Sequence, residues 1–368
     1  MLYENQPPQK AQAKQNGKSG HRYSRKNKKL YAALDLGTNN CRLLIVERGD
    51  GDSFTVRDSF TRIVRLGEGL DKTGALSEAA MERTIAALRI CASKIRRMNV
   101  GRIRCVATEA CRGASNGEAF IRSVRKRTGL RLEVIDGQAE AELATISCAA
   151  LFNAAAEDII LFDIGGGSTE VSRLQRQPND FFKITDSESL PLGVVRLAER
   201  HAGAAPHEHG YEGMLAESTQ RLQDFMHRQT GMDDLTKVQI IGTSGTVTTL
   251  AAVQLGLARY DRNVVDGCTI DTRNIIELIN SLRAQSRDEL AGNPCIGKQR
   301  ADLVLAGCAV LEAIYNQWPV AQMSVADRGL REGLLLRMMR ADRRRARNRN
   351  RRGGRGYRRP DNGRAEQT

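Results

Sequence analysis

Residues 161–170 read LFDIGGGSTE and combine a strand, a glycine turn and two carboxylates. The apolar start predicts a buried strand that ends at Asp163, and the glycines at 165–167 predict a turn whose backbone N–H groups can approach an anion. Ser168 adds a hydroxyl donor, and Glu170 resumes a strand. A hard cation such as Mg²⁺ prefers oxygen ligands of this kind beside bound phosphate. For this stretch alone, a tight β-hairpin with an acidic rim is the simpler interpretation, so the rest of the chain has to decide.

The first half of the chain carries a counterpart of this stretch. Residues 33–40, ALDLGTNN, again place a strand, an Asp-x-Gly turn and small polar residues in the same order. In each half two more strands follow, which indicates an antiparallel meander, and strand–helix alternation then indicates an α/β layer. The duplication predicts two α/β domains, with the two turns facing each other across an interdomain cleft.

Hydrophobic periodicity and end signals predict the remaining elements. Ser77 is expected to cap the first long helix, and Gly129 to end the next one. Helices are expected at 77–99, 116–128, 138–151, 193–200, 212–229, 246–257, 273–285, 300–317 and 329–339. Strands are expected at 30–36, 42–47, 54–60, 102–107, 132–135, 159–163, 169–173, 182–186, 238–241 and 323–326.

Composition indicates a globular chain of about two domains. Of 368 residues, 40% are hydrophobic and 27% are charged, as in soluble proteins. No apolar run approaches the ~18 residues of a membrane span, and the N-terminus has no signal-like stretch, so we expect no membrane partner and a cytoplasmic location. The eight cysteines form no C-x-x-C pair, which argues against a zinc ribbon and favours reduced, buried thiols.

The net charge of +14 is concentrated in the two ends of the chain. Residues 1–30 carry eight Lys and Arg against one Glu, and residues 337–368 carry thirteen Arg against three acids, so the stretch between them is slightly acidic at −3. The predicted organisation is therefore a basic disordered arm at 1–29, domains at 30–155 and 156–340, and an Arg/Gly-rich disordered tail at 341–368. The arms could bind RNA or another polyanion non-specifically, or be merely solvated; both interpretations stay open.

In sequence, residues 30–339 resemble the exopolyphosphatase / guanosine pentaphosphate phosphatase (Ppx/GppA) family. Eight blocks in order carry the resemblance: DLGTNNCRLLI at 35–45, LGEGLDKTGALSEAAMERT at 66–84, VATEACRGASNGEAF at 106–120, IDGQAEAEL at 135–143, FDIGGGSTE at 162–170, IIGTSGTVTTLA at 240–251, RADLVLAG at 300–307 and GLREGLL at 329–335. The resemblance implies a duplicated actin-like / sugar-kinase (ribonuclease H-like) fold. It also implies Mg²⁺-dependent removal of a terminal phosphate from a phosphoanhydride.

The same resemblance assigns roles to individual residues. Glu140 matches the catalytic glutamate that activates water, and Arg112 matches an arginine that would face the phosphate chain. The positions that match the two phosphate loops are Gly37, Thr38 and Asn39 in one and Gly165, Gly166, Gly167 and Ser168 in the other. Metal and water would be held by Asp163 and Glu170, with Asp35 as the counterpart in the first half.

Elementary chemistry supports the assignment of Glu140. Phosphoanhydride hydrolysis needs positioning, charge neutralisation and a placed carboxylate base. Glu140 follows Gly137 at a helix start, where the helix dipole would lower its pKa, so we expect it to be ionised at neutral pH. Three residues depart from the family pattern. Asn40 stands where the family has Ser and keeps a donor, whereas Ala139 and Glu142 stand where it has Glu and Arg, which puts the strength of polyanion binding in question.

Several functions stay open at this stage. Polyphosphate and pppGpp present the same terminal anhydride, so the sequence does not separate them as substrates. Of the two, pppGpp would link the enzyme to the stringent response. A catalytically weak polyphosphate or alarmone sensor and an ATP-dependent kinase of the same fold are further alternatives. A homodimer is also open. The Arg-rich tail is a hypothetical tether for long polyphosphate, on the ground of its charge.

A few other residues are weighed as minor candidates. His207-Glu208-His209, near His201, is more typical of a polar surface turn than of a metal site. Arg300 is a better candidate for contact with an anion than Asp302, which we expect to cap or pair on a helix. Two cysteines flank motif residues and are expected to be packing residues rather than nucleophiles, namely Cys41 and Cys111.

Overall fold

The computed structural model describes residues 29–178, 181–201, 209–232 and 234–353. The predicted arm at 1–29 and the tail from 354 lie almost entirely outside these residues. Among the helices in the described ranges, none combines the length and the apolar composition that crossing a membrane requires.

The first domain is built on a five-stranded sheet of order β3-β2-β1-β4-β5. Its strands are β1 (Leu30–Leu36), β2 (Asn40–Arg48), β3 (Phe54–Ile63), β4 (Arg102–Ala107) and β5 (Leu132–Val134). Its helices are α1 (Leu70–Thr73), α2 (Glu78–Arg97), α3 (Glu109–Gly113), α4 (Gly117–Thr128) and α5 (Gly137–Cys148), which a short 3₁₀ turn Ala149–Leu151 extends. As predicted, Ser77 caps α2 by accepting from the Ala80 N–H, and Gly129 ends α4 in the left-handed conformation at φ 79°.

The second domain repeats this pattern in a six-stranded sheet of order β10-β11-β9-β6-β7-β8. Its strands are β6 (Asp158–Ile164), β7 (Thr169–Arg176), β8 (Phe182–Leu190), β9 (Val238–Thr243), β10 (Thr269–Asp271) and β11 (Gln322–Ala326). Its helices are α6 (Val194–Arg200), α7 (His209–His227), α8 (Gly245–Gln254), α9 (Arg262–Val265), α10 (Thr272–Arg283), α11 (Arg287–Gly292), α12 (Val304–Gln317) and α13 (Leu330–Gly353), and a 3₁₀ turn Leu235–Lys237 precedes β9.

Sheet topology confirms the internal duplication. In the first sheet β1 pairs antiparallel with β2 and parallel with β4; in the second, β6 pairs antiparallel with β7 and parallel with β9. The third strand of each meander, β3 or β8, lies at the edge. Both domains therefore present their first β-turn, after β1 and after β6, at the end where their parallel strands terminate.

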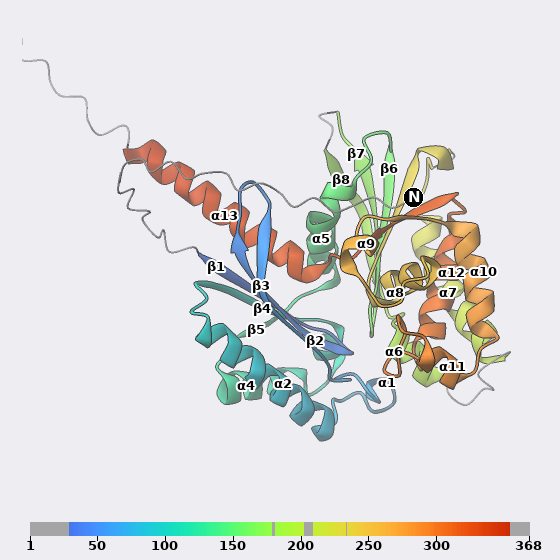
Figure 1. Ribbon diagram of the computed structural model, residues 1–368, viewed down its shortest axis with the longest axis horizontal. Coiled ribbons are helices and arrows are strands. Elements are labelled where there is room, and N and C mark those ends of the chain that lie inside the picture. The colour runs from blue at the N-terminus through green and yellow to red at the C-terminus, as the bar shows by residue number, and fades with distance from the viewer. Residues whose placement is uncertain (1–28, 179–180, 202–208, 233, 354–368) are drawn as a thin grey trace, which may run out of the picture.

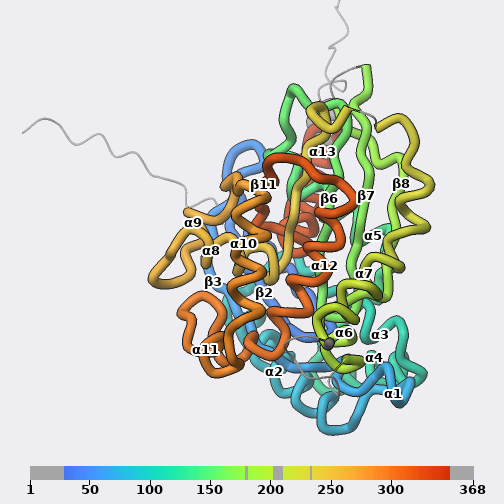
Figure 2. The backbone as a smooth tube through the Cα atoms, turned by 90° about the vertical axis from the view of Figure 1, so that its right-hand side faces the viewer, coloured from blue at the N-terminus to red at the C-terminus, as the bar shows by residue number. Residues whose placement is uncertain are grey.

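Helices cover both faces of the two sheets (Figures 1 and 2). Residues of α2 and α4 fill the core on one face of the first sheet, and α7, α10 and α12 contribute to the largest core, on the second sheet. Helix α5 lies between the sheets (Figure 1), because Leu143 packs in a core with β1 and α13 while Ala144 and Cys148 pack in a core with β6. The helix that carries Glu140 is thus held by both domains.

The last helix runs further than the sequence predicts. Expected at 329–339, it continues to Gly353, so residues 341–353 are helical where a disordered tail is predicted. Its first half packs on β1 and α5, and Asp342 then accepts hydrogen bonds from Tyr31 at 3.0 Å and from Arg102. Arginine and alanine are good helix formers, and these tertiary contacts stabilise a segment whose composition alone indicates disorder.

Candidate functional site

The two duplicated β-turns have the same backbone hydrogen bond and lie against each other. The Gly37 N–H donates to the Asn40 carbonyl, and the Gly165 N–H donates to the Ser168 carbonyl, both at 2.9 Å. A Cβ added to Gly167 would stand 2.3 Å from Thr38 Oγ1, and one added to Gly166 would stand 3.1 Å from the Asn39 Cβ. These glycines are therefore required by the close approach of the two turns; neither has the positive φ that would itself favour glycine.

Four N–H groups at the tips of these turns are free to bind an anion. Within the described residues, no acceptor is found for the N–H groups of Thr38, Asn39, Gly166 and Gly167. The neighbouring carbonyls of Gly165 and Gly166 are held at 3.0 and 2.9 Å by N–H groups of the first turn of α6. Successive free amides of this kind form a nest for phosphate.

The turns open into a cavity of about 150 Å³ that gathers most of the predicted site residues. Those lining it are Asp35, Gly37, Thr38, Asn39, Glu140, Asp163, Gly165, Gly166, Gly167, Ser168 and Glu170. Residues brought in from other parts of the chain include Asn40, Arg42, Thr108, Ser244, Gly245, Thr246, Thr249, Arg300, Leu303 and Leu330. The cavity therefore lies between the domains, where the sequence predicts the cleft.

Asp35 and Asp163 occupy equivalent places at the ends of β1 and β6. Burial raises the pKa of both carboxyls, and for Asp163 burial and the nearby Glu170 charge raise it to about 7. In the described part of the chain neither accepts a hydrogen bond or forms an ion pair, and both face the cavity. Paired carboxylates without donors suit a magnesium ion, which commonly takes one or two carboxylates and completes its shell with water and phosphate oxygens. No group of three or more His, Cys, Asp or Glu side chains that could hold a metal ion is found among the described residues.

Glu140 is buried and ion-paired, and the predicted direction of its pKa shift needs correction. Its helix begins at the Asp136 cap, and Glu140 Oε1 lies 2.6 Å from Arg112 Nη1. Burial and the charge of Glu170 nevertheless raise the pKa of Glu140 to about 9, outweighing Arg112. The direction of this shift is opposite to the one that the helix start alone predicts, because desolvation of a 5% exposed side chain exceeds the effect of the helix dipole in the ligand-free site.

Arg112, which the family resemblance predicts to face the phosphate chain, is not among the residues that line the cavity. Its guanidinium donates to Glu140, to Glu109 Oε2 at 2.7 Å and to the Ile135 carbonyl at 2.6 Å. These three acceptors hold the Arg112 guanidinium against Glu140. In this structure Arg112 therefore positions Glu140 and does not line the phosphate cavity.

Glu170 reaches the cavity from the start of its strand, β7. Its Oε1 accepts from Ser168 Oγ and from Ser189 Oγ, both at 2.7 Å. Burial raises its pKa despite these two hydrogen bonds. The structure thus separates the predicted acidic set: Asp35 and Asp163 have no donors, whereas Glu170 is fixed by serines next to Glu140.

Two arginines complete the cavity, and sequence reasoning missed one of them. Arg42 lies opposite Asp35 in the β1–β2 ladder, and no hydrogen bond or ion pair is found for it within the described residues. Arg300, a minor candidate from the sequence, donates to Thr249 Oγ1 at 2.7 Å; burial and the charge of Arg42 lower its pKa. Two guanidiniums that repel each other in one cavity favour a bound anion. The available signal for Arg42 was a charge directly before the apolar run at 43–46 of its strand.

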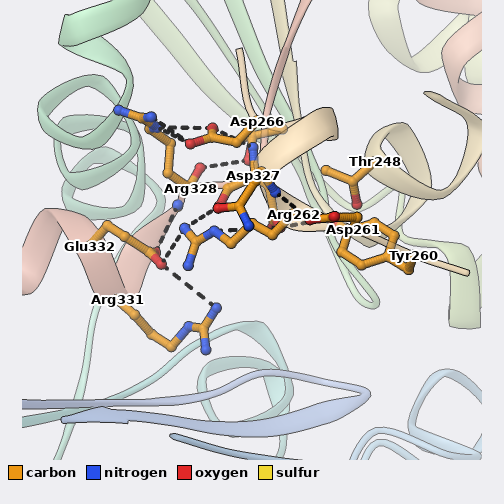
Figure 3. A network of polar contacts seen from close by, with 12 residues as sticks. Thr248, Tyr260, Asp261, Arg262, Asp266, Asp327, Arg328, Arg331 and Glu332 are labelled. Atoms are coloured by element: carbon orange, nitrogen blue, oxygen red, sulfur yellow. Dashed lines mark hydrogen bonds and ion pairs between the residues drawn. The ribbon is translucent and has the colours of Figure 1, made fainter. Parts of the chain in front are cut away.

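A second cavity of about 180 Å³ adjoins the first at Asp35, Arg42 and Asp163. A polar network, drawn in Figure 3, stabilises the part of this second cavity's wall that directly precedes α13. Arg262 Nη2 donates to Glu332 at 3.0 Å, the Tyr260 hydroxyl donates to Asp327 at 2.6 Å, and the Gly329 N–H donates to Glu332 at 3.1 Å. Burial alone would raise the pKa of Glu332, but Arg331 and Arg262 lower it, so the carboxylate stays charged within the network. The network connects α9 to the start of α13 beside the aspartate pair.

The remaining sequence candidates lie away from this cavity. The side chains at 207–209 are outside the described residues, and His201 lies 3.0 Å from Glu217. Asp302 forms an ion pair with Arg287, consistent with the pairing role expected for it. Glu142 lies 3.6 Å from Arg337 of α13 and does not line the cavity.

The two flanking cysteines have structural surroundings. Burial raises the pKa of Cys111 to about 12, and Cys41 Sγ lies 4.0 Å from the buried Cys91 Sγ. Neither thiol would form the thiolate that a nucleophile needs. Both fit the predicted packing role.

Comparisons with known proteins agree with this geometry. The model of the Ppx/GppA phosphatase family matches residues 44–342. Exopolyphosphatase 2 of Mycobacterium tuberculosis is 30% identical over 321 residues, which are 83% of this chain and 97% of that protein. The crystal structure of the Aquifex aeolicus Ppx/GppA family member superposes with a TM-score of 0.69 at 28% identity, covering 85% of this chain and 98% of that one. An exopolyphosphatase from Cytophaga hutchinsonii reaches 0.75 at 25% identity, covering 85% and 98%. The predicted duplicated actin-like fold is confirmed.

Proposed function

The chain belongs to the Ppx/GppA phosphatase family, whose exopolyphosphatases hydrolyse phosphoanhydrides, and from that premise we propose that it releases the terminal phosphate of inorganic polyphosphate. One observation carries the proposal. A single cavity holds four free backbone N–H groups, two guanidiniums and a pair of donor-free aspartates. Such a cavity has partners both for phosphate oxygens and for a cation that neutralises them.

Asp35 and Asp163 would hold Mg²⁺ in this mechanism. When bound, the ion supplies charge neutralisation at the phosphate oxygens and lowers the pKa of nearby carboxyl groups. The N–H groups of the two turns bind the terminal phosphate and orient it for in-line attack. Arg42 and Arg300 bind the oxygens of the phosphates that remain on the leaving chain.

Glu140 is the proposed general base. The Arg112 guanidinium at 2.6 Å favours its carboxylate form and holds it in one orientation. Glu140 accepts a proton from the attacking water, and Glu170, fixed by Ser168 and Ser189, lies beside it to position that water. Burial of both carboxyls excludes bulk water from the reacting phosphate.

The test is phosphate release from long polyphosphate, tripolyphosphate and pppGpp, with Mg²⁺ and with chelator. We expect Glu140→Gln to lower kcat about 10²- to 10⁴-fold. Glu142→Gln is the matched control, since Glu142 lies on the same helix but outside the cavity. Equal activity of wild type and Glu140→Gln would contradict the assigned base. ATP-dependent phosphoryl transfer to an acceptor would instead indicate a kinase, and phosphate release from polyphosphate without ATP would exclude one.

One observation favours pppGpp as a second candidate substrate. A further cavity of about 420 Å³ adjoins the phosphate cavity through Asn39 and Leu303, and its wall includes Val195, Ala198 and Met214. A partly apolar space of this size fits a nucleoside whose 5′-phosphates enter the phosphate cavity. Ala198→Phe, which fills that space, should raise KM for pppGpp and leave KM for polyphosphate unchanged. If both KM values stay unchanged, this cavity does not select the substrate.

A further inference from the structure

The second half of α13 passes the tip of the β2–β3 hairpin (Figure 1). A basic groove lies between them and shares no lining residue with the phosphate cavity. The groove encloses about 530 Å³ and is lined by Arg48, Asp52, Arg340, Arg343, Arg344, Ala346 and Arg347. Five guanidiniums face one carboxylate, so the lining carries a net charge of +4. None of the lining residues is polar and neutral, so the groove is dominated by positive charge.

The single carboxylate leaves much of this charge unbalanced. Asp52 accepts hydrogen bonds from Arg340 at 2.6 and 3.0 Å and also pairs with Arg343, which fixes the hairpin tip to the helix. Arg344 and Arg347 are exposed, and no ion pair or hydrogen bond is found for either within the described residues. Two arginines are thus structural, while others remain available to a ligand.

The spacing of the arginines places them on one side of α13. Positions 340, 343, 344 and 347 are related by three, four and seven residues, which puts them on one helical face. Like charges at this spacing repel and destabilise a helix. A polyanion in the groove would remove that repulsion, and a chain of phosphates matches a row of guanidiniums better than a single anion does.

The same helix connects the groove to the catalytic cavity. Leu330, the first residue of α13, lines both that cavity and the adjoining one. With a rise of 1.5 Å per residue, Arg340 and Arg347 lie about 15 and 25 Å further along the helix. A ligand that occupies both places must therefore be a chain at least this long.

We propose that this groove is a second binding site for the distal part of an inorganic polyphosphate chain whose end is in the catalytic cavity. The inference rests on the proposed function and adds chain-length selectivity to it. None of the lining residues that the structure describes is aromatic, so this part of the groove lacks the stacking surface by which proteins bind single-stranded nucleic acid. A base-free polyanion therefore fits the groove better than RNA does.

The test is the full-length double variant Arg344→Gln/Arg347→Gln. Glutamine keeps helix propensity, so α13 should stay folded. We expect KM for long-chain polyphosphate to rise about fivefold, and KM for tripolyphosphate, which is too short to reach the groove, to stay unchanged. The slope of log affinity against log salt for the long chain should fall in magnitude by about one to two. The matched control is Arg122→Gln/Arg125→Gln, which removes two exposed arginines at the same spacing from α4.

Equilibrium binding of long-chain polyphosphate to a Glu140→Gln background separates the two proposals. If the enzyme releases no phosphate from polyphosphate, the proposed function fails, yet groove binding is still measured. An unchanged affinity and unchanged KM in the double variant would overturn the groove proposal. The proposal would also be overturned if the α4 control weakened binding of polyphosphate equally. A third contrary outcome is that single-stranded RNA of equal total charge displaces polyphosphate from wild type but not from the double variant, since RNA would then be the better occupant of the groove.

Discussion

The β1–β2 and β6–β7 hairpins have the same turn and a different residue opposite the aspartate. In the first hairpin Asp35 pairs in register with Arg42; in the second Asp163 pairs in register with Glu170. One half of a duplicated fold thus brings a cation to the cavity at the position where the other half brings a carboxylate. The two halves therefore share equivalent backbone nests but differ at the residue opposite the aspartate. Arg42 in the first half favours anion binding, and Glu170 in the second half favours cation binding.

The turn tips differ in a complementary way. Thr38 and Asn39 carry side chains toward the second turn, where the equivalent residues are Gly166 and Gly167. Side chains of the first turn already fill the space beside Gly166 and Gly167, so the two turns fit together only when one carries side chains and the other carries glycines. The predictions below test this division, beginning with the largest expected effect.

The aspartate pair gives the largest expected loss of activity. Asp163→Asn and Asp35→Asn should each lower kcat/KM about 10²- to 10³-fold, because each removes a charge aimed at the cation and phosphates. Their stabilities should differ. In chelator at pH 8, Asp163→Asn should be more stable than wild type by about 1 kcal/mol, since it relieves a buried carboxylate beside Glu170. Asp35→Asn should gain less, because the charges of Arg42 and Arg331 offset part of the cost of burying Asp35. Denaturant unfolding would measure this, and equal shifts would contradict the proposed division.

Gly167→Ala should break the interlock of the two loops. Its Cβ would come within 2.3 Å of Thr38 Oγ1, so the turns must separate, and a misplacement of about 1 Å at a catalytic cleft costs roughly 10²-fold in activity. Thr38→Ala should restore part of that loss in the double variant, which a double-mutant cycle would detect. Gly292→Ala is the control, because nothing lies within 4 Å of a Cβ added there. An active Gly167→Ala enzyme would show that the loops do not have to touch.

Asn39→Ala should have a smaller effect, on substrate affinity alone. Asn39 Oδ1 is buried and has no donor in the described residues, so its removal leaves no lost hydrogen bond and should change stability by less than about 0.5 kcal/mol. Its side chain lines both the phosphate cavity and the larger adjoining one. We expect KM to rise several-fold with kcat nearly unchanged. A large loss of stability would instead assign Asn39 to the packing of the loops.

Asp342→Asn measures how much a weaker contact between α13 and the first domain changes stability and activity. Tyr31, Arg102 and Lys29 all donate to Asp342, and the hydrogen bond from Arg102 contributes most to lowering its pKa. Because the folded-state pKa is lowered, the carboxylate stabilises the protein fully above the unfolded value near 4, and this contribution is lost progressively as pH falls from there through the lower folded-state value. The variant should therefore lose about 1 kcal/mol at pH 7 and less at pH 3, with kcat unchanged. A fall in kcat would mean that docking of α13 also controls the catalytic cavity.

The sequence by itself determined the long helices, the long strands and the duplication, but not the short elements α1, α3, α9, β10 and α11. The apolar strands, the Ser77 cap, the Gly129 helix end and the two Asp-x-Gly turns are local patterns, and local physics decides them. The positions of the phosphate loops and of Glu140 also followed from these patterns together with the family resemblance. All of these loops and Glu140 line the same cavity.

Only the tertiary structure decided the charge states and the partners. Burial beside Glu170 raises the pKa of Glu140, which the helix start alone predicted to be lowered. Arg112 is directed at Glu140, and Arg42 and Arg300 join the cavity from strands and turns about 260 residues apart in the chain. The helix from Leu330 to Gly353 passes its predicted end because Asp52 of the β2–β3 hairpin binds Arg340 and Arg343, and because its own Asp342 accepts hydrogen bonds from Tyr31 and Arg102. Desolvation and long-range ion pairs depend on which surfaces meet, and a local pattern does not contain that information.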